Sequence, residues 1–167
     1  MPSIDKNAHE LWDIFDDNRN PTGRTVTRGT ALGDNENHLV AICYLVNSKG
    51  KLLFTRRAKS KVMAGYWECP GGGVLSGEDT LTAAIRETLE EVGIAVRAED
   101  ATLYSTIHAD HTFYDNWLFP CDVSIDQLVL QESEVDAAKW VSAAEFARME
   151  REHTVLEGID YFALLES

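Results

Sequence analysis

The sequence predicts an α+β fold, in which a mixed β-sheet has helices packed against it. Strand-like apolar runs occur both before and after the middle of the chain, and a long helical segment separates them. Two shorter helical segments follow near the C-terminal end. At 167 residues, of which 44% are hydrophobic, the chain is long enough for one domain with a proper core.

The first part of the chain is predicted to form strands joined by turns. Two short strands within residues 10–27 flank the turn-rich segment 16–23 and form an N-terminal hairpin. After a polar connection over 29–36 come an apolar strand over 39–46, a turn over 47–50 and a returning strand over 51–57. We expect residues 1–36 to be a hairpin extension packed on a domain of residues 37–167.

One helix is predicted over 80–92, after a Gly-rich loop over 71–73. Asp79 is suited to the N-cap, residues 80–92 contain no Gly or Pro, and Gly93 supplies a stop just past the last turn. At about 100° per residue, two faces separate. The side predicted to be buried carries Leu81, Ala84, Ile85, Thr88, Leu89 and Val92, and the arc predicted to stay outside carries Glu87, Glu90 and Glu91.

The second half is predicted to complete the sheet. Residues 95–96 extend briefly, and strands over 102–109 and 113–123 form a long hairpin with its turn near Asp110. A short strand over 139–141 is followed by helices over 143–151 and 155–165.

The three glutamates on one arc of the helix point to a divalent cation. Carboxylates crowded within one turn repel one another unless a cation lies among them. Hard oxygen ligands of this kind suit Mg²⁺ or Mn²⁺ shared with substrate phosphates. For Glu90 and Glu91 taken alone, the competing interpretation is a solvated acidic face.

The spacing around these glutamates resembles the Nudix box. From Gly72, five residues lead to Glu78, seven more lead to Arg86, and the run from Glu87 to Ile94 completes the pattern. Thr88 stands where the family more often has an aliphatic residue. Upstream, the run from Tyr66 to Gly73 is similar to the family's Trp to Pro-Gly-Gly segment, with Cys69 where a larger apolar residue is typical.

The resemblance implies an α/β/α sandwich and a hydrolase that cleaves a phosphoanhydride bond. The substrate would be a nucleoside diphosphate linked to another moiety, or a similar small diphosphate, and the cofactor Mg²⁺ or Mn²⁺. Arg86 and Glu78 would form an ion pair that braces the loop against the helix. The metal ligands implied are Glu87, Glu90, Glu91 and the backbone carbonyl near Gly72.

The general base stays open at this point. The acidic cluster at Glu132 and Glu134 resembles the position where many Nudix enzymes place an additional carboxylate. The candidate catalytic residues are therefore Glu87, Glu91, Glu132 and Glu134, with the base among Glu87, Glu132 and Glu134.

A basic segment precedes the glycines and is a candidate contact for substrate phosphate. No acid occurs between His38 and Trp67, while six Lys and Arg residues do. Arg57, with its neighbour Arg56, is the candidate contact if the fold is as implied. The competing interpretation is a solvated strand end.

Two alternatives to a hydrolase remain. The segments 37–39 and 47–61 are also similar to isopentenyl-diphosphate isomerases, but alignment at Gly77 puts Gly71 and Gly73 where that family has its catalytic Cys and a metal-binding His. Glycine supplies neither the acid nor the base that isomerisation needs. A non-catalytic nucleotide-binding module is the other alternative, and loss of the box glutamates, all present here, would indicate it.

Composition limits the partners. A formal charge of -13 argues against nucleic acid, and no run of eighteen apolar residues exists to span a membrane. The first residues lack the apolar region of a secretory signal, and three scattered cysteines give no disulfide framework, so we expect a cytoplasmic protein. The expected partner is a small-molecule diphosphate substrate, and a homodimer stays open.

Overall fold

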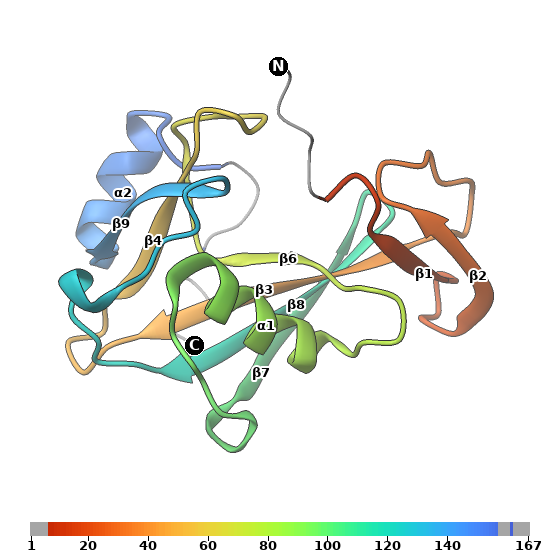
Figure 1. Cartoon of the computed structure of the whole chain (residues 1–167), viewed down its shortest axis with the longest axis horizontal. Coiled ribbons are helices and arrows are strands. Elements are labelled where there is room, and N and C mark those ends of the chain that lie inside the picture. The colour runs from red at the N-terminus through yellow and green to blue at the C-terminus, as the bar shows by residue number, and fades with distance from the viewer. Residues whose placement is uncertain (1–6, 157–160, 162–167) are drawn as a thin grey trace.

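The computed structural model describes residues 7–156 and 161, and it has the predicted α+β architecture (Figure 1). A mixed sheet of seven strands carries one helix on each side, and a separate two-stranded hairpin precedes it. The strands are β1 (Leu11–Phe15), β2 (Pro21–Thr27), β3 (His38–Val46), β4 (Leu52–Arg57), β5 (Trp67–Glu68), β6 (Gly71–Gly73), β7 (Thr102–Ala109), β8 (Thr112–Pro120) and β9 (Val135–Val141). The helices are α1 (Thr80–Val92), α2 (Ala143–Arg151) and the short 3-10 turns η1 (Ala98–Asp100) and η2 (Ile125–Gln127).

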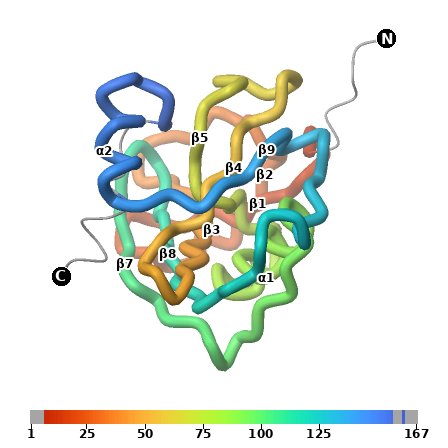
Figure 2. Tube along the Cα trace, turned by 90° about the vertical axis from the view of Figure 1, so that its left-hand side faces the viewer, coloured from red at the N-terminus to blue at the C-terminus, as the bar shows by residue number. Residues whose placement is uncertain are grey.

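The sheet divides beside β3, and this division makes room for a pocket. β3 pairs in parallel with β8 along its whole length, but it pairs with β4 only at Val46 and Leu52. β4 then turns away to pair with β5 and β9, and β6 takes its place beside β3. Figure 2 shows β4, β5 and β9 grouped together, with α1 on the other side of β3.

Two hydrophobic clusters hold the helices to the sheet. One joins α1 to β3 and β8 and includes Ala41, Ala84 and Phe119, all fully buried. The other joins α2 to β4 and β9 and includes Phe54 and Phe146. Alternate residues of a strand face opposite sides of the sheet. In β3, the side buried against α1 carries Leu39, Ala41 and Cys43. The other side faces the pocket described below and carries His38, Val40 and Ile42.

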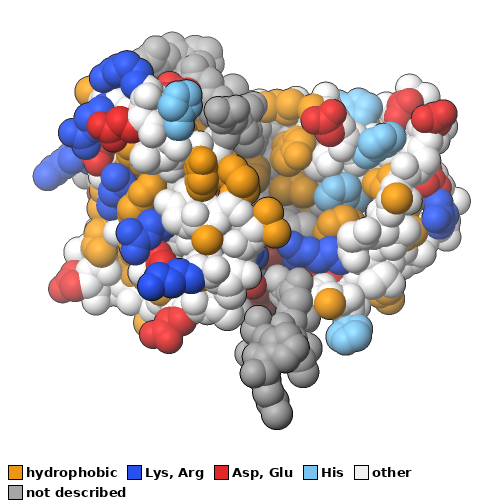
Figure 3. Space-filling model, turned by 90° about the horizontal axis from the view of Figure 1, so that it is seen from above, with side chains coloured by type: hydrophobic (Ala, Val, Ile, Leu, Met, Phe, Trp, Pro, Cys, Tyr) orange, Lys and Arg blue, Asp and Glu red, His pale blue; other side chains and the backbone are white. Residues whose placement is uncertain are grey.

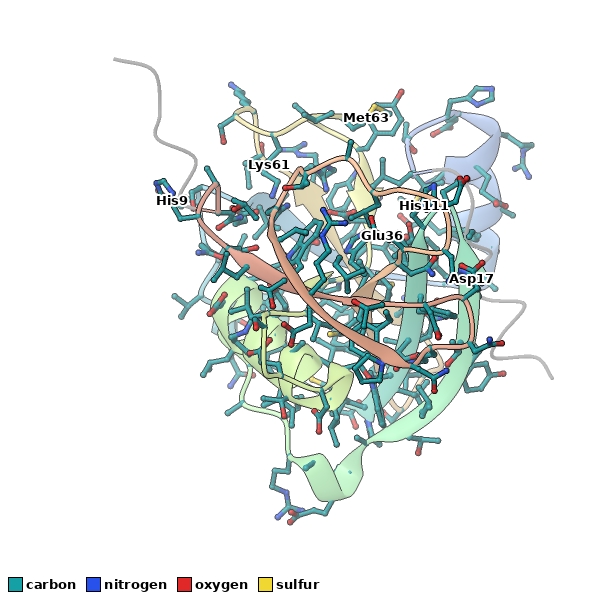
Figure 4. The ribbon with its side chains drawn as sticks, turned by 90° about the vertical axis from the view of Figure 1, so that its right-hand side faces the viewer. His9, Asp17, Glu36, Lys61, Met63 and His111 are labelled. Carbon is teal, nitrogen blue, oxygen red and sulfur yellow. The ribbon has the colours of Figure 1, made fainter. Side chains whose placement is uncertain are left out.

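The N-terminal hairpin is fixed to the body of the protein. Arg19, at the turn of the hairpin, makes a bidentate ion pair with buried Asp115 of β8. Its Nη1 and Nη2 donate to the two carboxylate oxygens at 2.8 and 2.5 Å. The backbones of Asn37 and Phe15 exchange two hydrogen bonds, each of 2.8 Å. At the same end, the ring of His111 bonds the carbonyl of Glu36 at 2.9 Å, and both residues are labelled in Figure 4.

Several element predictions need correction. The predicted Gly-rich loop is strand β6, and β5 was not predicted, because pairing with β3 and β4 creates these short strands. β9 begins at Val135 rather than Lys139, and residues 95–96 form no strand. The predicted helix over 155–165 lies largely outside the described residues, and Val155 instead bridges Trp67.

Within the described residues, no helix combines the length and the apolar character that a membrane crossing requires.

Candidate active site

Helix α1 begins and ends where its caps place it. The side chain of Asp79 accepts a hydrogen bond from the backbone N–H of Thr82 at 2.7 Å. Gly93 takes the left-handed conformation, with φ of 73°, and its N–H bonds the carbonyl of Leu89 at 3.0 Å. These caps fix the register of the helix, and hence the direction in which its glutamates point.

The buried face of α1 differs from the predicted one. Leu89 is 52% exposed, whereas Ala83 is fully buried and Glu91 is only 8% exposed. The expectation that all three box glutamates stay outside is therefore wrong for Glu91. The helix packs on β3 and β6, so the face that meets this strand pair is buried whatever its polarity.

Arg86 connects the helix to the loop that precedes it. Its Nε and Nη2 donate to the two carboxylate oxygens of Glu78 at 2.7 and 3.0 Å, and Nη2 also reaches the carbonyl of Gly73 at 3.2 Å. Nη1 donates to Glu87 at 2.9 Å and to Glu90 at 3.4 Å. Burial alone would lower the pKa of Arg86, but the bonds with Glu78 and the charge of Glu87 outweigh burial and raise it.

The two inner glutamates are held in a setting that disfavours their charge. Burial raises the pKa of Glu91 well above its usual range, and the nearby charges of Glu87, Glu68 and Glu134 add to the rise. A backbone hydrogen bond from Gly71 opposes it. Burial also raises the pKa of Glu87, although the charge of Arg86 opposes that rise. A buried carboxylate among other carboxylates needs either a proton or a cation.

The three glycines of β6 let the chain pass between β3, α1 and the hairpin. A Cβ on Gly72 would lie 2.6 Å from the carboxyl carbon of Glu87, and one on Gly73 would lie 2.9 Å from Nε1 of Trp12. A Cβ on Gly71 would overlap the carbonyl of Ala41. The Cα of Gly72 therefore lies close to the carboxylate of Glu87.

A pocket of about 470 Å³ opens at this place. Its floor is the half-buried face of β3, β7 and β8, with Val40, Ile42, Ile107 and Tyr114. The glycines of β6 and the carboxylates of α1 also line it, and beside them the N-terminal hairpin contributes Trp12, whose indole lies against Gly73. From above, the surface is hollowed between the two sides of the molecule, and hydrophobic side chains gather in the hollow (Figure 3).

The pocket carries an excess of negative charge. Seven Asp and Glu side chains line it, against three Lys and Arg side chains. The acids are Glu10, Glu68, Glu87, Glu90, Glu91, Asp110 and Glu134, and the bases are Arg28, Arg57 and Lys61.

Each lining base is paired with a lining acid. Arg28 pairs with Glu10 at 3.0 Å, and Arg57 pairs with Glu68 at 2.8 Å. Lys61 forms an ion pair with Glu134, and it reaches the pocket from the loop between β4 and β5 (Figure 4). Burial raises the pKa of Glu68, and the charge of Arg57 opposes the rise.

The structure brings only some of the predicted residues to this pocket. Glu134 and Arg57 line it. Glu132 is exposed and lies outside the lining. Arg56, the next residue of the strand, points elsewhere: its Nε bonds Asp136 at 2.6 Å, and its guanidinium lies over the ring of Trp67.

Sequence reasoning gave no role to several lining residues. Lys61 belonged to the basic segment, and Glu68 to the run resembling the family's Trp to Pro-Gly-Gly segment. Trp12 and Arg28 belong to the hairpin and reach the pocket only because the hairpin folds back onto β3. No local pattern in the sequence marks that approach.

The donor set fits a hard divalent cation, although it is not preassembled. Within the described part of the chain, no three His, Cys, Asp or Glu side chains already surround one point as metal ligands. Nη1 of Arg86 lies between Glu87 and Glu90 and bonds both. Nη1 bonds one oxygen of each carboxylate, Oε1 of Glu87 and Oε2 of Glu90, and the pair with Glu78 uses other nitrogens of Arg86.

Comparison with known proteins identifies the family of this chain. The family model of the NUDIX domain matches residues 36–159, which include β3, the box and the final strand. The chain belongs to the Nudix family. It is a Nudix hydrolase, an enzyme class that acts on diphosphate compounds, and the predicted family and fold are confirmed.

Two relatives and one solved structure are similar to this chain. An uncharacterised Nudix hydrolase of Listeria monocytogenes is 36% identical over 157 residues, 93% of this chain and 91% of the relative. An isopentenyl-diphosphate Delta-isomerase of Corynebacterium diphtheriae is 29% identical, over 83% of this chain and 82% of its own. A crystal structure from Deinococcus radiodurans shares the fold with a TM-score of 0.77 at 18% identity, over 94% of this chain and 98% of that one.

Proposed function

We propose that this Nudix hydrolase depends on Mg²⁺ or Mn²⁺ and cleaves the phosphoanhydride bond of a nucleoside diphosphate linked to another moiety, or of a similar small diphosphate. The observation that carries the metal requirement is the charge of the pocket. Seven lining acids against three lining bases would repel a diphosphate, and every lining base already has a carboxylate partner. Binding of the anion therefore needs an added cation.

The residues that would hold the cation are Glu87, Glu90, Glu91 and the carbonyl of Gly72. Their oxygen donors suit Mg²⁺ and Mn²⁺, and Glu91 is a buried carboxylate whose charge a cation would stabilise. When bound, such an ion neutralises phosphate charge and lowers the pKa of a ligated water.

Other pocket residues are proposed to contact the substrate and to transfer a proton. Arg57 is proposed to contact a substrate phosphate, because it lines the pocket and Arg56 does not. Glu134 is favoured over Glu132 as the group that takes a proton from water, for the same reason. Glu87 and Glu91 stay candidates for catalytic roles beside metal ligation. The half-buried apolar floor would receive the uncharged part of the substrate.

Isomerase activity is a second candidate, since an isopentenyl-diphosphate isomerase is among the relatives. The structure argues against it at the two positions in question. A side chain at Gly71 would overlap the backbone of β3, and one at Gly73 would run into Trp12. The acid and base of an alkene isomerisation therefore cannot stand at these positions without displacing β3 or the hairpin.

The test is a panel of nucleoside diphosphate conjugates, dinucleoside polyphosphates and nucleoside triphosphates, assayed for phosphate products with Mg²⁺ or Mn²⁺. We expect turnover of at least one diphosphate compound, and complete loss with excess chelator. Turnover that persists in excess chelator would contradict the metal requirement. Binding of a nucleotide without any hydrolysis across the panel would favour the non-catalytic module instead.

A further inference from the structure

We propose that the N-terminal hairpin takes part in metal binding from a distance, with Asp13 of β1 as a positioning residue for the loop that follows β6, and through that loop for the Gly72 carbonyl. This inference rests on the proposed metal-dependent function. It concerns a strand that precedes the residues matched by the family model.

Both carboxylate oxygens of Asp13 accept hydrogen bonds from the loop between β6 and α1. Ser76 Oγ donates to one oxygen at 2.6 Å, and the backbone N–H of Gly77 donates to the other at 2.9 Å. These bonds, that from Ser76 first, lower the pKa of Asp13 and keep it ionised at neutral pH. Thr25 of β2 donates to the same carboxylate at 2.9 Å, so the group is fixed from within the hairpin as well.

The backbone of β1 adds a third connection to the same loop. The N–H of Ser76 donates to the carbonyl of Leu11 at 2.8 Å. Gly77 has a φ of 84°, a left-handed conformation that favours glycine, so the chain reverses sharply at the point that Asp13 holds. The bonds to Ser76 and Gly77 therefore tie the loop's tightest turn to the hairpin.

Trp12 limits the movement of the loop at its other end. Its Nε1 would lie 2.9 Å from a Cβ on Gly73, so the indole packs closely against the end of β6. The indole is stacked on His38, with ring centroids 4.1 Å apart, and the guanidinium of Arg28 lies 5.8 Å from its centroid. Because the ring is in contact with both His38 and Arg28, we expect it to restrict the movement of Gly73.

The loop is thus clamped from two sides. On the helix side, Arg86 bonds the carbonyl of Gly73, and Glu78 accepts from the N–H of Leu75 at 3.0 Å. On the hairpin side stand Asp13 and Trp12. Gly72 lies immediately before this clamped segment and against Glu87, and metal–ligand distances tolerate only about 0.2 Å of change. Loosening one side should therefore lower the affinity for the cation before it unfolds the protein.

The test compares Asp13→Ala with Asp16→Ala. Asp16 belongs to the same hairpin, but among the described residues its carboxylate accepts hydrogen bonds from Asn18 and Asn20 of the hairpin turn alone, at 2.8 to 3.1 Å. Mn²⁺ affinity is measured by calorimetry without substrate, and amide hydrogen exchange is followed over residues 72–77. Loss of a group that supports metal ligands typically weakens metal affinity about 10–100-fold.

We expect Asp13→Ala to weaken Mn²⁺ binding by about 10-fold or more and to speed exchange at Ser76 and Gly77. Asp16→Ala should change neither. Asp13→Asn retains one acceptor oxygen and should recover part of the affinity.

A folded Asp13→Ala variant that binds Mn²⁺ like the wild type overturns the proposal, as does an equal loss in Asp16→Ala. If the wild-type chain binds no Mn²⁺, the proposed function fails. Unchanged exchange at Ser76 and Gly77 in Asp13→Ala overturns the positioning role by itself.

Discussion

Gly72→Ala is expected to weaken metal binding strongly while leaving the fold intact. A Cβ at this position would lie 2.6 Å from the carboxyl carbon of Glu87. Carbon atoms in contact normally stay about 3.5–4.0 Å apart, so that carboxyl group must move by about 1 Å. Because it is the far end of a flexible side chain, the movement costs little stability.

The same movement is large for a metal ligand. Ligand distances are held to within about 0.2 Å, so a shift of about 1 Å takes Glu87 out of the ligand set. We expect the Kd for Mn²⁺ to rise about 100-fold, the upper end of the effect of losing a supporting residue. With Mn²⁺ at 100 times the wild-type Kd, binding stabilises the wild type by about 2.7 kcal/mol and the variant by about 0.4 kcal/mol.

Thermal unfolding with and without Mn²⁺ measures this difference. In a chain of this length, 1 kcal/mol corresponds to about 2–4 °C in Tm. Mn²⁺ should therefore raise the Tm of the wild type by about 5–11 °C and that of Gly72→Ala by about 1–2 °C.

Two other glycines provide controls. Gly71→Ala would place a Cβ 3.1 Å from Cα of Ile42 and into the Ala41 carbonyl, so it should destabilise the protein even without metal. Gly50→Ala has open space around it and only its φ of 72° against it, so it should cost about 1–2 kcal/mol and leave the Kd for Mn²⁺ unchanged. Wild-type Mn²⁺ affinity in folded Gly72→Ala would refute Glu87 as a ligand.

Three further outcomes are expected. Glu91→Gln should lower turnover about 100-fold or more and stabilise the metal-free protein. Because burial raises the pKa of Glu91, the stability of the wild type falls as pH rises above the ordinary glutamate pKa. Denaturant unfolding should therefore show that the variant's advantage in free energy of unfolding grows with pH and disappears in acid. Glu78→Gln should lower Tm more than it weakens Mn²⁺ binding, and an unchanged Tm would contradict the bracing role. Incubation with isopentenyl diphosphate in deuterated water should give no deuterium incorporation, since Gly71 and Gly73 carry no acid or base; incorporation without hydrolysis of any diphosphate would support the isomerase instead.

The sequence predicted those features that local chemistry decides. The bounds of α1 follow from the Asp79 cap and the left-handed Gly93, and both lie within one turn of the helix ends. The hairpin of β7 and β8 likewise turns where predicted, at Asp110 and His111, both with positive φ. Such signals depend on neighbours in the chain and are therefore readable without the fold.

Features decided by tertiary pairing were missed. β6 consists of three glycines, so no side-chain pattern could mark it as a strand, and it exists because Val40 to Ile42 of β3 pair with it. The exposure of Leu89 and the burial of Glu91 follow from the side on which α1 meets β3 and β6. Hydrophobic periodicity alone favoured the opposite assignment for both residues.

The pairing of Arg57 and Lys61 with acids would couple the proposed metal binding to the proposed substrate binding. A phosphate that competes for Arg57 would weaken its pair with Glu68, and one that competes for Lys61 would weaken its pair with Glu134. Either competition would leave a less neutralised carboxylate near Glu91, whose pKa the charges of Glu68 and Glu134 already raise. The added negative charge has to be compensated within the pocket. A divalent cation at the helix glutamates would supply that compensation, and the less neutralised Glu134 would then be available to accept a proton from water.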